Sequence, residues 1–192
     1  MIAGVLGTIR RVHLVLVMLA LTLAVTEPAL RRYGDKLQIA LPMIAWACAA
    51  TDGKGTELFL RFAAVFTVAH GTKIALGDAP INQRPNGRSE GFPSAHTAAA
   101  AFGASSLASE CLKGHPVGQA VSILAAAFVG GSRIEARQHD LIQVMAGAIL
   151  GWGGERVLRR ECGLRRRVVA GLQRVRQAVG RYLSTRFGLI GA

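Results

Sequence analysis

Six apolar stretches, separated by short polar or Gly/Pro-containing segments, constrain the fold of this 192-residue chain more than any other feature. None of them alternates apolar and polar residues with β-branched enrichment, so the pattern predicts helices and no sheet. Six apolar helices in one short domain are difficult to cover with polar surface in water. We therefore expect an all-α, six-helix, membrane-embedded bundle, with helices over residues 12–25, 37–50, 58–76, 93–109, 116–131 and 141–153.

Taken singly, these stretches are weaker evidence for transmembrane helices than the six together. Most are shorter than the roughly 18 apolar residues that mark a secure transmembrane helix, and 58–76 contains Arg61 and Lys73. The first stretch follows two arginines and so has the charged and apolar regions of a signal peptide, although no small-residue cleavage site follows it. We favour a retained first helix, with a signal peptide of an exported soluble protein as the alternative.

Basic residues concentrate in segment 155–192, where ten arginines and two glutamates supply +8 of the chain's net charge of +12. Apolar side chains recur there at three- and four-residue steps, the stripe of an amphipathic helix: Leu164, Val168, Val169, Leu172, Val175, Val179, Leu183 and Phe187. We divide the chain into a membrane domain, 1–154, and a basic amphipathic tail, 155–192. The tail is expected to bind anionic lipid headgroups, or else to pack on a protein surface. No aromatic stacking platform accompanies the charge, so nucleic acid is not an expected partner.

The basic tail also predicts orientation, because lysines and arginines beside membrane spans stay on the cytoplasmic side. The tail is then cytoplasmic in a multi-pass protein of a bacterial-type cytoplasmic membrane. With six spans, the third and fifth connections face the outer side. The three cysteines, Cys48, Cys111 and Cys162, are widely spaced and odd in number, so we expect thiols and no disulfide framework.

The third and fifth connections, with the residues that flank them, hold the residues with the chemistry of an anion site. Ser94 is a good N-cap for the alanine-rich run behind it, and the first N–H groups of such a helix attract anions. His96, in that first turn, has a side chain that can exchange a proton near neutral pH. Lys73 and Arg84 add cations on the same side.

The fifth connection adds a second histidine and a planar cation. Arg133 offers two parallel donors to phosphate oxygens, and His139 follows it by six residues. Gln143 lies one helical turn after His139, where it could orient the imidazole. The sequence has no cluster of Asp and Glu suited to Mg²⁺ and no Gly-rich phosphate loop, so a metal-free mechanism without a cofactor is expected.

These segments, in this order, resemble the type 2 phosphatidic acid phosphatase family, which shares its core with vanadium haloperoxidases and bacterial acid phosphatases. The family signature is Lys-x6-Arg-Pro, then Pro-Ser-Gly-His, then Ser-Arg-x5-His-x3-Asp. Arg84-Pro85, Pro93-Ser94-Ala95-His96 and Ser132-Arg133-x5-His139 match it, over a region from about Leu58 to Gly153.

The sequence departs from the signature at three positions. The position seven before Arg84 is Gly77, and Lys73 lies eleven before it, so a four-residue insertion would restore the match. Ala95 replaces a glycine but keeps the backbone N–H that the family uses. Gln143 replaces the aspartate that orients the nucleophilic histidine in the family; it can accept the same hydrogen bond but brings no charge.

The resemblance implies a membrane-embedded, metal-independent phosphatase acting on a lipid phosphate or pyrophosphate. In it, His139 attacks phosphorus to form a phosphohistidine, and His96 protonates the leaving oxygen and then activates water. The phosphate oxygens would be held by Lys73, Arg84, Ser94, the N–H of Ala95, and Arg133. Two alternatives remain: a catalytically weakened phospholipid-binding or structural membrane protein, motivated by Gln143, and an exported soluble acid phosphatase or haloperoxidase.

Overall fold

The structure is a computed structural model that describes residues 12–15, 17–19 and 30–159, with 167, 170–171, 174–175 and 177–181 of the tail. The chain divides into two compact units, Met1–Glu155 and Arg156–Ala192. The described tail residues in the stripe, Val175 and Val179, are helical and exposed. The other stripe residues predicted from the sequence lie outside the described residues: Leu164, Val168, Val169, Leu172, Leu183 and Phe187.

The described part of the chain is helical and contains no strand, which confirms the all-α prediction. The α-helices are α2 (Leu30–Thr51), α3 (Gly55–Leu76), α4 (Ala95–Ser106), α5 (Pro116–Glu135) and α6 (Leu141–Leu158). Two shorter elements are the 3₁₀-helix η1 (Pro80–Asn82) and the π-helix η2 (Leu107–Cys111). Helix α4 begins after its cap at Ser94, and η2 continues it beyond the predicted end.

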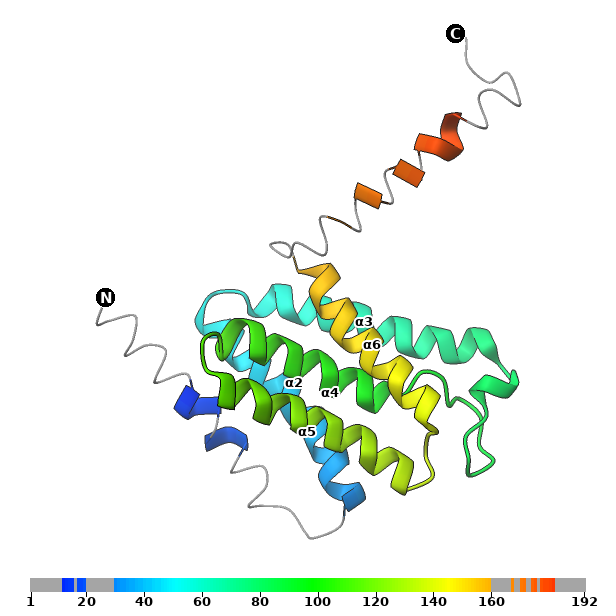
Figure 1. Ribbon diagram of the computed structural model, residues 1–192, viewed down its shortest axis with the longest axis horizontal. Coiled ribbons are helices and arrows are strands. Elements are labelled where there is room, and N and C mark those ends of the chain that lie inside the picture. The colour runs from blue at the N-terminus through cyan, green and yellow to red at the C-terminus, as the bar shows by residue number, and fades with distance from the viewer. Residues whose placement is uncertain are drawn as a thin grey trace. The chain divides into compact units, whose positions relative to one another are not determined.

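Helix α2 is the central element of the bundle, because it packs against α3, α4, α5 and η2 (Figure 1). Its buried Leu41 meets Phe102 of α4 and Leu58 of α3 in one apolar core. Val15 and Leu19, from the described part of the first apolar stretch, belong to the same core. The 58–76 and 116–131 predictions fall within α3 and α5, so the apolar pattern positioned these helices correctly.

Glycines allow α6 to approach α4 at the level of the backbone. A Cβ on Gly147 would overlap the carbonyl oxygen of Ser94, and a Cβ on Gly151 would overlap that of Ala98. Such close contact of small residues is common between helices in membranes. It fixes the start of α4, where two of the predicted site residues lie, against the middle of α6.

A buried ionic cluster joins four elements at one end of the bundle. Arg61 of α3 donates to Glu155 of α6 at 3.0 Å and to Glu110 of η2 at 3.1 Å. Ser105 of α4 donates to the second oxygen of Glu155 at 2.8 Å. Arg61 is tolerated inside the apolar stretch 58–76 because this pairing compensates the cost of burying its charge.

The cysteine prediction is wrong, because Cys48 and Cys111 form a disulfide. It joins the last turn of α2 to η2, and both residues are buried. Their separation of 63 residues gave no sequence signal, since it is the packing of α2 alongside α4 and η2, which run in the same direction, that brings the two sulfurs together. Cys162 lies outside the described residues.

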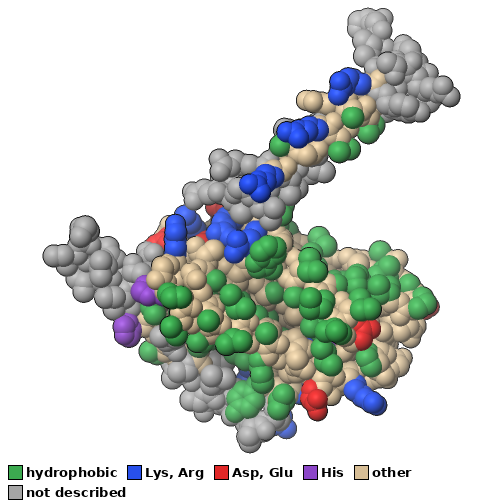
Figure 2. Space-filling view, in the orientation of Figure 1, with side chains coloured by type: hydrophobic (Ala, Val, Ile, Leu, Met, Phe, Trp, Pro, Cys, Tyr) green, Lys and Arg blue, Asp and Glu red, His purple; other side chains and the backbone are tan. Residues whose placement is uncertain are grey.

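Two helices, α3 and α5, are long and apolar enough to cross a membrane by length and composition. Within the described residues the six predicted spans are not confirmed, because α4 has only 12 residues, α2 begins with a charged turn, and much of the stretch 12–25 lies outside the description. Large apolar side chains are nevertheless exposed along α3, α5 and α6, among them Phe59, Leu124 and Ile149. Figure 2 shows hydrophobic side chains spread across the visible face of the helical body, among uncharged side chains and backbone, with few charged side chains between them.

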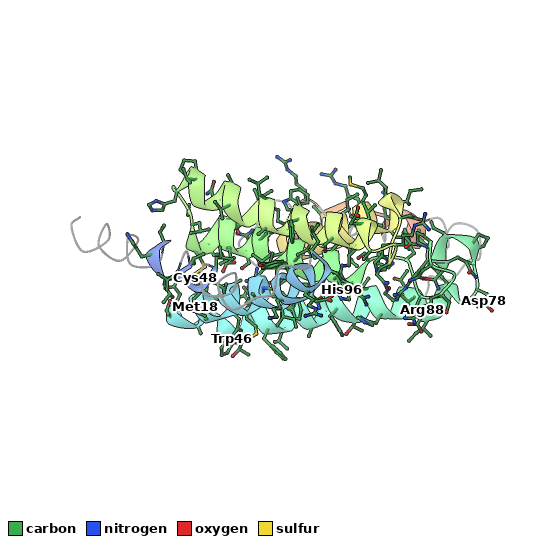
Figure 3. The ribbon with its side chains drawn as sticks, turned by 90° about the horizontal axis from the view of Figure 1, so that it is seen from below. Met18, Trp46, Cys48, Asp78, Arg88 and His96 are labelled. Atoms are coloured by element: carbon green, nitrogen blue, oxygen red, sulfur yellow. A yellow bond between two sulfur atoms is a disulfide. The ribbon has the colours of Figure 1, made fainter. Side chains whose placement is uncertain are left out.

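The alternating directions of the helices bring the predicted motifs to one end of the bundle. Helices α3 and α5 end there, and α4 and α6 begin there. In Figure 3, Asp78 and Arg88 of the α3–α4 connection lie toward one end, Cys48 lies toward the other, and His96 lies between them. The Arg61 cluster and the disulfide are therefore on the side away from the predicted site.

Candidate active site

The first pair of site residues, Lys73 and Arg84, converge on one backbone oxygen. Lys73 occupies the last turn of α3, and its Nζ donates to the carbonyl oxygen of Glu90 at 2.5 Å. Arg84 Nη2 donates to the same oxygen at 3.1 Å. Glu90 has a φ of 62°, a left-handed conformation that is costly for a residue other than glycine. In this conformation the carbonyl oxygen of Glu90 accepts hydrogen bonds from both Lys73 and Arg84.

The four additional residues between Lys73 and Arg84 form a compact turn. Gly77 ends α3 with a φ of 49°, and η1 follows it. Asn82, fully buried, donates to the carbonyl oxygens of Lys73 and Gly77 and accepts from the N–H of Phe92 at 3.0 Å. Asn82 thus stabilises the turn formed by the inserted residues, so that Lys73 and Arg84 reach the same carbonyl oxygen although eleven positions separate them in sequence.

The second motif forms a capped helix start. The Ser94 hydroxyl accepts from the N–H of Thr97 at 3.4 Å and from its hydroxyl at 3.0 Å, while the N–H of Ser94 donates to the carbonyl of Gln143 at 2.9 Å. The N–H groups of Ala95 and His96, in the first turn of α4, have no intrahelical acceptor. They are available to an anion, and the His96 ring is beside them.

Arg133, in the last turn of α5, is buried and tightly held. Its Nη1 donates to Asp35 of α2 at 2.7 Å, its Nη2 to the carbonyl of Arg31 at 2.8 Å, and its Nε to Ser132 Oγ at 3.3 Å. A Cβ on Gly34 would overlap Ser132 Oγ, so glycine is what allows α2 to come this close. The guanidinium is fixed before any ligand binds.

His139 and Gln143 are in contact, as their four-residue spacing predicts. Nδ1 of His139 and Oε1 of Gln143 are 3.1 Å apart. Since an amide oxygen only accepts, the proton of the neutral ring lies on Nδ1, which leaves the lone pair on Nε2. Nε2 is therefore the ring nitrogen that could act as a base or a nucleophile.

Gln143 also uses its amide nitrogen, which donates to the carbonyl oxygens of Ile81 at 3.0 Å and Gln83 at 2.7 Å. The amide thus ties His139 to the segment that carries Arg84. Asp140, the nearest carboxylate, caps α6 by accepting from the N–H of Gln143 at 2.8 Å and does not reach the imidazole.

The electrostatics of the site keep His139 neutral. Burial, and then the positive charges of Lys73, Arg84 and His96, outweigh the hydrogen bond to Gln143 and lower the pKa of His139 to about 4. Burial also lowers the pKa of Arg84, although Glu90 opposes the shift. A neutral His139 near pH 7 is the form that can act as a nucleophile.

The candidate site is closed except at one side. Ser94, Arg133, His139 and Gln143 are each no more than 3% exposed, and Lys73 is 5% exposed. The His96 side chain, at 37%, is far more open. Arg84 is partly exposed, and its buried Nε has no hydrogen-bond partner. Among the described residues, no three His, Cys, Asp or Glu side chains are grouped so that they could hold a metal ion.

A family model described as the PAP2 superfamily matches residues 11–160. The chain belongs to the PAP2 superfamily. Members of this superfamily are generally phosphatases, and haloperoxidases share it, so the activity at a coarse level is that of a phosphoester hydrolase or a haloperoxidase-type enzyme. No curated protein and no solved structure matches the chain.

The PAP2 motif residues predicted from the sequence lie together at one end of the bundle. Asn82 and Asp35 were missed, because neither belongs to a recognised motif. The one available signal for Asn82 was its position in segment 77–83, where four extra residues must fold back; its side chain makes the hydrogen bonds that close this turn. Asp35 gave no signal beyond being a lone carboxylate near the start of an apolar stretch.

The low pKa of His139 makes a testable prediction about pH. His139 is neutral above about pH 4, so the acidic limb of kcat/KM for phosphoester hydrolysis should lie near that value. Lys73→Met removes a repelling positive charge, so the pKa of His139 should rise and the limb should move up by about one pH unit. Lys54→Met, at the other end of α3, is the control. This account would be contradicted if the acidic limb of kcat/KM stayed at the wild-type pH in Lys73→Met, or if it moved by the same amount in both variants.

Proposed function

We propose that this PAP2 protein is a membrane-embedded phosphatase that hydrolyses a lipid phosphate or pyrophosphate through a phosphohistidine on His139. The observation that carries the proposal is the pairing of His139 and Gln143 within the field of Lys73 and Arg84. It leaves Nε2 of a neutral, buried imidazole free to attack, beside fixed positive charge. Phosphoryl transfer needs chiefly positioning and charge stabilisation, both of which such a site supplies.

The reaction follows from these positions. His139 Nε2 forms a bond to phosphorus while the bond from phosphorus to the leaving oxygen breaks, and protonated His96 gives its proton to that oxygen. Water then attacks phosphorus, loses a proton to His96, and releases phosphate as the bond to Nε2 breaks. Lys73, Arg84, Arg133 and the first N–H groups of α4 stabilise the charge on the equatorial oxygens.

An apolar groove beside the site supports a lipid substrate. The groove, of about 880 Å³, lies between α2 and α3 and is lined by side chains such as Trp46, Phe59 and Phe62. Its lining includes Gln38 and Ala99, one helical turn beyond Asp35 and His96. From Gln38 to Ala50 it follows α2 for about 18 Å, at 1.5 Å per residue. An acyl or prenyl chain of a phosphate held at His96 would fit along it.

The exposed apolar surface supports placing the bundle in a membrane, where such side chains face lipid. The basic tail supports a cytoplasmic C-terminus, with its arginines on anionic headgroups and the site on the outer side. The Cys48–Cys111 disulfide is compatible with this orientation, since both cysteines are no more than 3% exposed and cytoplasmic thiols would have little access to them.

Phosphate release from a panel of lipid phosphates and pyrophosphates tests the activity. The full chain, purified in detergent and assayed in EDTA, should release phosphate from at least one of them. His139→Ala should lower the rate by at least about 1,000-fold, because the covalent step is lost. His115→Ala, at the opposite end of the bundle, is the matched control and should keep wild-type activity.

The proposal would be overturned if the wild-type protein released phosphate from none of the lipids in the panel. A specific observation would then favour a second function, that of a phospholipid-binding or structural membrane protein: Gln143 brings no negative charge to stabilise a protonated His139. Binding of phosphatidate vesicles by the inactive protein would distinguish it.

The groove can be tested separately from the chemistry. Phe59→Gln places an amide in the groove, and Ile149→Gln makes the same change on an exposed residue of α6 outside it. With long-chain phosphatidate, Phe59→Gln should lower kcat/KM about tenfold, the effect of losing one apolar contact, whereas Ile149→Gln should have little effect. With glycerol 3-phosphate, both variants should match the wild type. Equal losses on the two substrates would exclude the groove as the lipid site.

A further inference from the structure

Asp35 of α2, outside all three motifs, touches two residues of the proposed site at once. Its Oδ1 accepts from Arg133 Nη1 at 2.7 Å and lies 3.3 Å from His96 Nε2. Among the described residues, this carboxylate is the side chain within ion-pair distance of the His96 ring. Asp35 therefore connects the proposed general acid to one of the proposed phosphate-binding cations.

The position of Asp35 is determined by its surroundings. Arg133 is held on its other sides by Ser132 Oγ and the carbonyl of Arg31, so it offers the carboxylate a fixed donor. Gly34, the residue before Asp35, allows α2 to lie against Ser132. With 42% of its side chain exposed, Asp35 sits on the same open side as His96.

The charges that face His96 show why a carboxylate is needed there. Arg133 of α5, Lys73 of α3 and Arg84 of the α3–α4 connection all act on the ring as positive charges, and His139 is a neutral neighbour. Asp35 is the negative charge among the groups that act on it. Burial, and then these three cations, lower the pKa of His96, and Asp35 is the group that opposes the shift. A general acid must hold a proton before the reaction, so the carboxylate acts in the direction that this role requires.

We propose that Asp35 is a positioning residue for His96: its carboxylate orients the ring through Nε2 and favours the protonated form that a general acid needs. This rests on the proposed function. With Nε2 facing the Asp35 carboxylate at 3.3 Å, Nδ1 is the atom that gives its proton to the leaving oxygen and later takes one from water. The negative charge that Gln143 does not supply beside the nucleophile is thus supplied beside the acid.

Asp35→Asn tests the proposal, because asparagine can still accept from Arg133 but carries no charge. Its effect should depend on how much the leaving group needs a proton. For phosphatidate, whose leaving alkoxide is a strong base, kcat/KM should fall at least about 30-fold, a part of the usual contribution of a general acid. For p-nitrophenyl phosphate, whose leaving group departs without a proton, it should fall less than about threefold.

Asp78→Asn is the matched control, because Asp78 is an exposed carboxylate of the α3–α4 connection that lies apart from His96 in Figure 3. It should leave both substrates unaffected. Equal losses on both substrates in Asp35→Asn would indicate a structural role and overturn the proposal. A gain in kcat/KM would also overturn it, by showing that Asp35 competes with the phosphate for Arg133.

A second measurement decides the role of Asp35 without activity. In ¹⁵N-histidine-labelled full-length protein at alkaline pH, the neutral His96 ring should carry its proton on Nε2, which the nitrogen chemical shifts report. Asp35→Leu should shift the population toward the Nδ1–H form. An unchanged tautomer would refute the positioning role, even if the wild type proved to be no phosphatase. A wild type that hydrolyses nothing but keeps the Nε2–H form would refute the proposed function alone.

Discussion

The buried amide of Gln143 holds together three segments that are far apart in sequence. Its oxygen accepts from the proposed nucleophile, His139, and its nitrogen donates to the backbone beside Arg84. The carbonyl of the same residue accepts from Ser94 at the start of α4. A Cβ on Gly91 would overlap the Gln143 side chain, so the backbone at position 91 can pack against this amide only because the residue is glycine.

This arrangement gives a physical reason for two departures from the family signature. The four additional residues after Lys73 form the turn and η1, which bring the carbonyls of Ile81 and Gln83 to position 143. A carboxylate there could only accept, and it would face two carbonyl oxygens that need donors. An amide satisfies the histidine and the carbonyls together. The longer spacing between Lys73 and Arg84 and the glutamine at position 143 therefore depend on each other. As a consequence, the proposed nucleophile, His139, has no charged hydrogen-bond partner.

The sequence predicted the helices, and the contacts within each motif, because apolar periodicity and short-range spacing are local. Ser94 as a cap and the contact between His139 and Gln143 required only helical geometry. What depends on packing between distant elements was not predictable: the Cys48–Cys111 bond, the burial of Arg61 with Glu155, and the approach of Asp35 to His96. Six membrane spans were predicted from apolar content, and in the part of the chain that the structure describes, α3 and α5 are the helices with the length and composition of a span.

The central claim is that His139 Nε2 becomes covalently phosphorylated, and trapping that intermediate tests it most directly. Protein quenched in alkali within milliseconds of mixing with a turning-over lipid phosphate, then digested and analysed by mass spectrometry, should carry an acid-labile phosphoryl group on the peptide that contains His139. The group should be absent from His139→Ala and should accumulate in His96→Ala when the substrate has a good leaving group, because the second step needs a base. Turnover with no phosphorylated peptide, or with the phosphoryl group on another residue, would contradict the account.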